Sequence, residues 1–172
     1  MRKTVLLIWM VVVFLGVASA DEGHHHEALT QEQLGTVHFP VSCSAEAQKT
    51  FEKGVALLHS FWYEEAEKTF LEAGKEDSKC AMANWGAAMS LWHQLWDQPG
   101  KAILDRGAIE LKKADDEKPA TERERDYIKA AEAFYSDDDK SHHEARAQAY
   151  SDAMEKFKAP GGGLGYYCFS SC

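Results

Sequence analysis

The sequence lacks the motifs of the common nucleotide-binding and hydrolytic sites. It has no G-x-G-x-x-G or P-loop glycine pattern, no G-x-S-x-G nucleophile motif, no H-E-x-x-H zinc motif and no acidic run with the ligand order of a calcium loop. None of its four cysteines has the sequence context of a catalytic thiol. These absences predict a protein that performs no covalent chemistry and holds no cofactor.

Positive charge is also scarce. The chain carries 19 Lys and Arg against 28 Asp and Glu, which gives a formal net charge of −9, and it shows no Lys/Arg cluster. A nucleic-acid binder needs a basic face, so we expect no nucleic-acid partner. No apolar run after residue 20 approaches the roughly 20 residues of a membrane-spanning helix, so we expect no membrane contact for the mature chain.

The first 20 residues have the pattern of a secretory signal peptide. Arg2 and Lys3 precede an apolar run at 5–17, and residues 18–20 form an A-x-A cleavage signal. We therefore expect residues 1–20 to be removed and the mature chain to be periplasmic or secreted. A membrane anchor that stays attached is the alternative, and the short apolar run argues against it.

The rest of the chain divides into three regions. Residues 21–43 are expected to form a flexible His-containing arm that ends in an extended segment. Helical periodicity predicts a domain over 44–158, with Ser44 capping its first helix and Thr121 forming a capping box with Glu124. The third helix is predicted from an apolar stripe of residues three and four apart, namely Met82, Trp85, Met89, Trp92 and Trp96. Residues 159–172 are expected to form an irregular tail, because Pro160 and the glycines at 161–163 stop any helix.

A quartet of one spacing occurs three times in the helical region. Its members are Thr50, Lys53, Gly54, Leu57; Met82, Trp85, Gly86, Met89; and Tyr127, Ala130, Ala131, Phe134. The spacing matches the W-x2-L-G-x2-Y half of the tetratricopeptide repeat (TPR) signature, and Ala66, Phe70 and Ala73 supply the second half. From about residue 34 to 158 the chain resembles TPR proteins. The segments GTVHFPVSC, LLHSFWYEEAEKTF, CAMANWGAAMSLWH and RERDYI are similar to bacterial exported TPR proteins of undescribed role.

This resemblance implies an all-α fold, a right-handed superhelical stack of about three helix pairs. It also implies an interaction scaffold that binds a peptide or a partner helix in the groove lined by the first helices of the pairs. The candidate groove residues are Gln48, Phe51, Val55, Leu58, His59, Ala83, Ala87, Ser90 and Leu91. Close helix packing is expected at Gly54 against the helix that carries Ala66. If the gap admits one methyl group, Gly54→Ala should be nearly neutral or slightly stabilising.

The cysteines favour one disulfide. Cys43 and Cys80 lie in the repeat region of a chain expected to reach an oxidising compartment, so we expect them to be bonded, with two free buried thiols as the alternative. Such a bridge would fasten the extended stretch to the second repeat unit. Cys168 and Cys172 lie in the tail and have no place in the repeat pattern.

The eight histidines raise two alternatives to a scaffold. His24, His25 and His26 could bind a divalent metal ion weakly, which would make the chain an exported metal-binding protein. A weaker alternative is an enzyme whose site includes His59 and His93, each near the end of the first helix of its unit. The competing interpretation is that each of these imidazoles bonds a helix-end carbonyl and packs on an aromatic ring.

The C-terminal end of the repeat region has no polar capping helix. Similar exported TPR proteins continue with further units, so the array is expected either to be truncated or frame-shifted or to have its exposed stripe covered by the aromatic tail. We expect the apolar stripe of Tyr150, Met154 and Phe157 to be uncovered in a monomer, and self-association through this last helix is then possible.

Overall fold

The computed structural model describes residues 34–93, 98–136 and 142–156 of the chain. In these ranges the ordered elements are six helices of two turns or more, and no strand is present. They are α3 (Ala45–His59), α4 (Tyr63–Glu76), α5 (Ala81–Ser90), α6 (Lys101–Asp116), α7 (Glu122–Tyr135) and α8 (His143–Lys156). The predicted all-α class is therefore confirmed. The signal peptide at 1–20, the His24–His26 arm and the tail at 159–172 lie outside the described residues.

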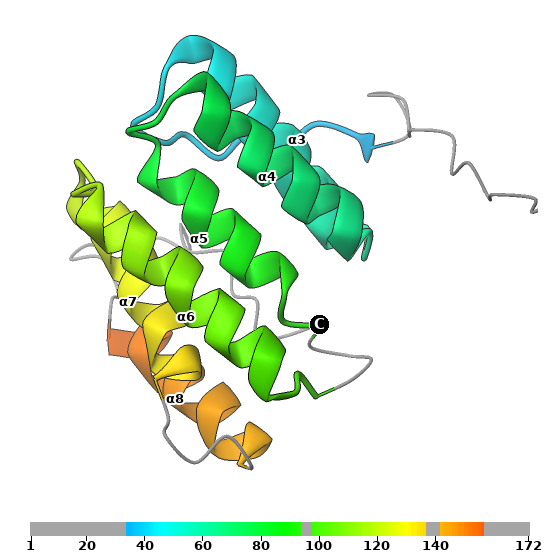
Figure 1. Cartoon of the computed structure of the whole chain (residues 1–172). Helices are drawn as coiled ribbons and strands as arrows, with labels where there is room; N and C mark the ends of the chain where they lie inside the picture. Colours follow the sequence, from blue (N-terminus) through cyan, green and yellow to red (C-terminus); the bar gives the residue numbers. More distant parts are fainter. Residues whose placement is uncertain (1–33, 94–97, 137–141, 157–172) are drawn as a thin grey trace, which may run out of the picture.

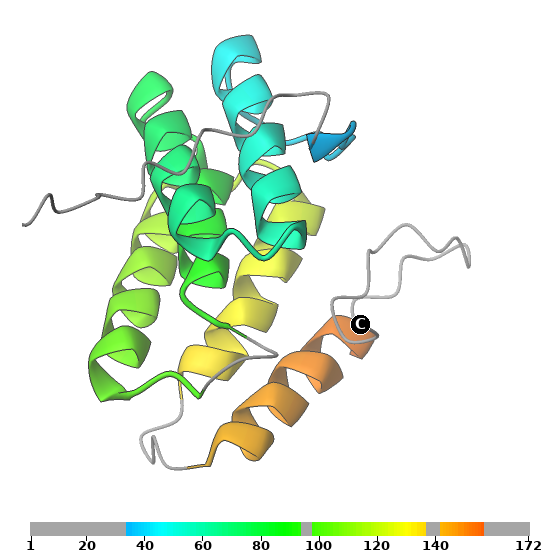
Figure 2. The ribbon, with the colours of Figure 1, turned by 90° about the vertical axis from the view of Figure 1, so that its right-hand side faces the viewer.

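Consecutive helices pack against one another throughout the described chain, as Figure 1 shows. In addition, α5 packs on both α3 and α7, so the odd-numbered helices α3, α5 and α7 form one layer. Figure 2 shows α4 and α6 on the side of α5 that faces away from α3 and α7. No described helix is long and apolar enough to cross a membrane.

Helix α5 is the centre of this arrangement. All its residues except Asn84 are buried, and a helix that is apolar on every side belongs in the interior. The Trp85 indole N–H donates to the Tyr127 carbonyl of α7 at 3.2 Å, and the Tyr135 hydroxyl donates to the Ala88 carbonyl at 2.7 Å. These two bonds join α5 to α7 through buried polar groups that would otherwise be unsatisfied.

The end of α5 differs from the prediction. The helix ends at Ser90, before Trp92, and Trp96 lies outside the described residues. Trp92 is nevertheless buried, because its ring stacks on Phe134 of α7 with centroids 3.9 Å apart. The three- and four-residue spacing correctly predicted burial of Trp92, but its ring is placed by tertiary packing after the helix has ended.

Small residues allow close helix packing on both sides of Phe70. The ring of Phe70 is fully buried, and it lies against Gly54 of α3 and Gly86 of α5. A Cβ added at Gly54 would come within 2.7 Å of Phe70 Cε1. The expectation that Gly54 packs on the helix carrying Ala66 is confirmed. The condition set for a neutral Gly54→Ala is not met, because an added methyl group would crowd the Phe70 ring.

Helix α8 packs against α7 and against Trp92, which follows α5. Tyr150 is only 2% exposed and packs edge-on against Trp92, with ring centroids 5.0 Å apart. Met154 is half-buried, and Phe157 lies outside the described residues. The prediction of an uncovered Tyr150 is therefore wrong, because this side chain turns inward toward Trp92.

Candidate functional site

An extended segment of the chain lies across the layer of α3, α5 and α7. Residues 37–42, called the bound segment below, have no regular secondary structure and run alongside α3 before entering it (Figure 1). The surface that receives them is called the three-helix face. It consists of Gln48, Phe51 and Glu52 of α3, Trp85 of α5, and Arg123, Glu124 and Tyr127 of α7.

The polar contacts of this face go to the main chain of the bound segment. The Gln48 amide accepts from the Val41 N–H at 2.7 Å and donates to the Phe39 carbonyl at 2.9 Å. Glu52 Oε1 accepts from the Phe39 N–H at 2.9 Å. One amide side chain thus pairs with a donor and an acceptor two residues apart, as a neighbouring strand would.

Glu124 holds the end of the bound segment. Its carboxylate is 4% exposed; Oε2 accepts from the Thr121 N–H at 3.1 Å, and Oε1 accepts from the Ser42 N–H. The predicted capping box of Thr121 and Glu124 is confirmed. Its second oxygen has a further role that the box does not predict, since it bonds a residue 82 positions earlier in the chain.

Phe39 is the apolar anchor of the segment. Its ring is 5% exposed and lies among Phe51, Trp85 and Tyr127, with centroids 5.4, 5.9 and 5.3 Å away. The Arg123 guanidinium carbon lies 4.7 Å from the Phe39 centroid, and Nη1 donates to the Pro40 carbonyl at 3.1 Å. Aromatic pairs and a cation over a ring add to the stabilisation that burial provides.

The hinge between the bound segment and α3 is fastened twice. Cys43 and Cys80 are bonded with Cα atoms 4.8 Å apart, which confirms the predicted pairing. Asp77 accepts hydrogen bonds from the Lys79 N–H at 3.0 Å and the Ser44 N–H at 2.7 Å. These bonds, the one from Lys79 first, lower the pKa of Asp77. Ser44 also caps α3 as predicted, since its hydroxyl accepts from the Ala47 N–H at 3.2 Å.

The predicted groove residues have different positions in the structure. Gln48 contacts the bound segment through its amide, and Phe51 contacts Phe39 while being fully buried. Val55, Leu58 and Ala87 are buried in the hydrophobic core. Ala83 is buried as well, and His59 is exposed at the end of α3, where partial desolvation lowers its pKa.

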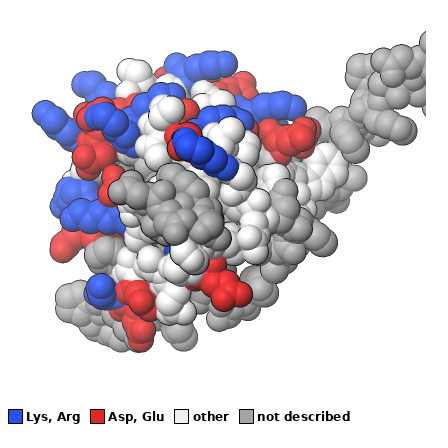
Figure 3. All heavy atoms as spheres, turned by 60° about the horizontal axis from the view of Figure 1, so that its bottom comes forward, with Lys and Arg blue, Asp and Glu red and all other residues white. Residues whose placement is uncertain are grey.

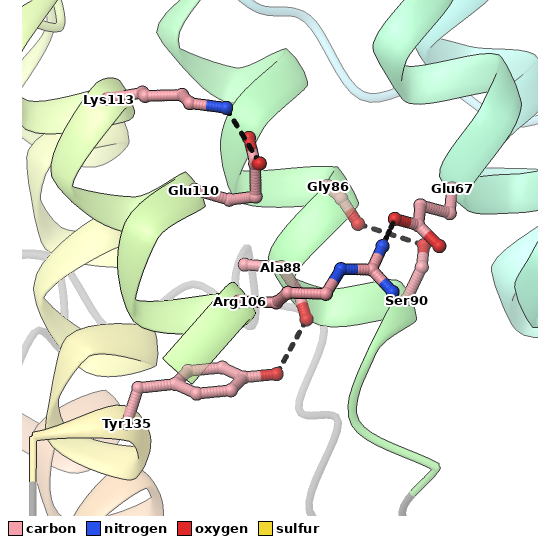
Figure 4. Close-up of polar contacts among 8 residues, drawn as sticks. All are labelled: Glu67, Gly86, Ala88, Ser90, Arg106, Glu110, Lys113 and Tyr135. Atoms are coloured by element: carbon pink, nitrogen blue, oxygen red, sulfur yellow. Dashed lines mark hydrogen bonds and ion pairs between the residues drawn. The ribbon is translucent and has the colours of Figure 1, made fainter. Parts of the chain in front are cut away.

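Ser90 and Leu91 line a second site, the α4–α6 hollow. This cavity of about 260 Å³ lies between α4, the end of α5 and the start of α6. Figure 4 shows Arg106 of α6 reaching across α5 to Glu67 of α4, with which it forms an ion pair. The Ser90 hydroxyl donates to the Gly86 carbonyl at 2.9 Å. The hollow therefore contains charges of both signs beside apolar side chains such as Leu91 and Ile103.

The two histidines considered for catalysis have different surroundings. His93 lines the α4–α6 hollow and stacks on Tyr63 with ring centroids 4.4 Å apart, which is the aromatic packing expected of a structural histidine. His59 is not among the residues lining the hollow. Among the described residues no three His, Cys, Asp or Glu side chains are grouped to hold a metal ion.

The surface carries interspersed charges. On the face shown in Figure 3, Lys and Arg alternate with Asp and Glu around a band of uncharged residues. Ion pairs between residues four apart occur along α6, where Lys101 pairs with Asp105 and Lys112 with Asp116. Exposed pairs of this kind contribute little to stability and mark a solvated surface.

Models of known protein families, curated proteins and solved structures were compared with the chain, and none of the three comparisons finds a match. The functional argument therefore depends on the geometry of the three-helix face and the α4–α6 hollow. Sequence reasoning missed five residues of the three-helix face as contacts of an extended chain, namely Glu52, Trp85, Arg123, Glu124 and Tyr127. Arg123 and Glu124 are separated from the bound segment by about 80 residues, and no local pattern signals such a contact.

Proposed function

We propose that the protein is an exported interaction module of the TPR type, in which the three-helix face holds an extended peptide and no covalent chemistry takes place. The observation that supports the proposal is the paired hydrogen bond of Gln48 to the main chain at Phe39 and Val41. Such a contact recognises an extended backbone without requiring a particular side chain.

The packing order supports the repeat architecture within this proposal. Each described helix packs on the next, α5 packs on α3 and α7, and Phe70 lies between the glycines of two successive units. A right-handed superhelical stack of three helix pairs would produce these contacts. The Cys43–Cys80 bridge supports an oxidising location, because disulfides persist in the periplasm and outside the cell.

Photo-cross-linking on the full chain tests the proposal. A photoreactive amino acid is placed at His38, which is exposed beside the three-helix face, and at Ile109, which is 55% exposed on α6 and serves as the matched control. In the producing cell, a protein adduct that forms from position 38 and not from 109 supports the proposal. Adducts that form equally from both positions, or from 109 alone, contradict it.

A further inference from the structure

We infer that residues 37–42 are an exchangeable occupant of the three-helix face, which accepts in their place an extended peptide carrying an aromatic residue followed by proline. The inference rests on the proposed function. It adds which class of peptide the three-helix face accepts, and that residues 37–42 block this face in the free chain. The bound segment would then be an autoinhibitory contact that any partner has to displace.

The contacts of the face explain why the occupant can be exchanged. Gln48, Glu52 and Glu124 hydrogen-bond main-chain groups of the segment, at Phe39, Val41 and Ser42. Glu52 also has a side-chain contact at the exposed edge of the segment, where its Oε1 lies 3.8 Å from His38 Nδ1. Any extended chain presents the same donors and acceptors at the same spacing. The hydrogen bonds of the face therefore do not distinguish its own residues 37–42 from an extended peptide supplied by another molecule.

Selectivity comes from the place of Phe39. Three aromatic rings surround this side chain and Arg123 closes over it, so the site fits a flat apolar ring and leaves no room for a charged group. Proline suits the next position for two reasons. It has no N–H that would need an acceptor, and it keeps the preceding residue extended. The Pro40 carbonyl remains free to accept from Arg123.

The attachment of the segment sets how easily it leaves. It is continuous with α3 through the hinge at Cys43, so its effective concentration at the face is high and a free peptide competes poorly. A small dithiol can loosen this hinge. The Cys43–Cys80 S–S bond breaks, each sulfur receives a proton, and the dithiol supplies two electrons as it becomes a cyclic disulfide.

Peptide binding to the full chain tests the inference. Labelled TVHFPVS and the matched peptide TVHAPVS are titrated by fluorescence anisotropy against the wild type, Phe39→Ala and the control Phe61→Ala. Phe61 is also an aromatic residue, but it is 46% exposed in the α3–α4 turn. We expect Phe39→Ala to bind TVHFPVS at least about tenfold more tightly than wild type does, because its own segment no longer fills the aromatic site. TVHAPVS should not gain affinity, and Phe61→Ala should match the wild type.

A folded Phe39→Ala that binds both peptides equally, or TVHFPVS no better than wild type does, overturns the inference. Circular dichroism establishes whether this variant keeps the helical content of the wild type. If it does not, hydrogen exchange on the unmodified chain decides. After reduction and with excess TVHFPVS, the amides of Phe39, Val41 and Ser42 should exchange faster, while the exchange rates of the α4 amides should not change. Excess TVHAPVS should leave the exchange rates of all these amides unchanged. Unchanged protection at these three amides overturns the inference.

The two proposals fail separately. If position 38 gives no partner adduct but the peptide exchanges, the face can accept an extended peptide and the exchangeable segment stands, but the proposed role as an interaction module in the producing cell falls. If a partner adduct forms and the peptide does not exchange, the chain has a partner, but residues 37–42 are a permanent part of the fold.

Discussion

The three-helix face and the α4–α6 hollow lie on opposite sides of α5, and they differ in what holds them together. The three-helix face is aromatic and filled, and its polar groups make part-buried hydrogen bonds to the main chain of the bound segment. The hollow is open, and one ion pair with an Arg106 side chain that is 53% exposed bridges it. Burial makes each contact on the first surface costly to lose, whereas solvent can replace the contact across the second.

The largest difference between the two surfaces is expected at the anchor of the bound segment. Phe39→Ala should lower the free energy of unfolding by about 3 to 5 kcal/mol, because it empties a site enclosed by three rings. Phe61→Ala, in the exposed turn, should change it by less than about 0.5 kcal/mol. Urea denaturation of both variants measures the contrast. Equal effects would show that Phe39 is not an anchor.

A smaller loss is expected at the carboxylate that joins α7 to the segment. Glu124→Ala leaves the N–H groups of Thr121 and Ser42 without their acceptor, which should cost about 2 to 3 kcal/mol. Glu122→Ala, an exposed neighbour in the same turn, is the control. If the two variants denature at the same urea concentration, the buried carboxylate contributes nothing specific.

Replacing glycine by alanine should change stability in opposite directions at Gly54 of α3 and Gly74 of α4. Gly54→Ala should destabilise by about 1 to 2 kcal/mol, since crowding against a fully buried ring outweighs the helix preference of alanine. At Gly74 a Cβ would meet Ala83 Cβ at an ordinary 3.5 Å, so Gly74→Ala should be neutral or stabilise by up to about 1 kcal/mol. Thermal melting of both variants is the measurement. A Gly54→Ala variant as stable as Gly74→Ala would mean that the Phe70 ring can move.

The ion pair across the hollow should matter less. Arg106→Ala is expected to cost at most about 1 kcal/mol, and added salt should reduce that cost. A double-mutant cycle with Glu67→Ala isolates the pair. A coupling energy well above 1 kcal/mol at high salt would show that the ion pair across the hollow contributes as much as a buried contact of the three-helix face.

The smallest expected effect is a change in pH dependence at the hinge. Backbone hydrogen bonds lower the pKa of Asp77 in the folded chain. Its carboxylate therefore stabilises the fold above its usual pKa of about 4, and this contribution is lost as the pH falls through the lower folded value. Asp77→Asn should lose less stability than wild type between pH 5 and acid conditions. Parallel pH profiles for the two chains would contradict this assignment.

Local patterns in the sequence predicted much of the fold. The Ser44 cap, the Thr121–Glu124 box and the Cys43–Cys80 bridge are each found in the structure. Each of the two caps depends on residues three positions apart, and such signals can be read directly from a sequence.

The site could be predicted only in part. Gln48 was a candidate because it lies on the first helix, but nothing near Phe39 in the sequence shows that its ring would meet Trp85 and Tyr127. Of the candidate groove residues, Gln48 and Phe51 contact residues 37–42 of the same chain, a contact that the sequence did not predict. Apolar spacing predicts that a helix face is covered, and it does not say whether a neighbouring helix, a partner or an earlier segment covers it.

The bound segment also affects the order in which the chain acquires its structure. Ser42 bonds a residue 82 positions later, and Pro40 bonds one 83 positions later. A chain is synthesised from its N-terminus, so residues 37–42 have to wait until α7 has been made. Closing so long a loop costs more entropy than pairing adjacent helices, which favours early formation of α3 with α4. The earliest part of the described chain to be made is therefore among the last to reach its final place.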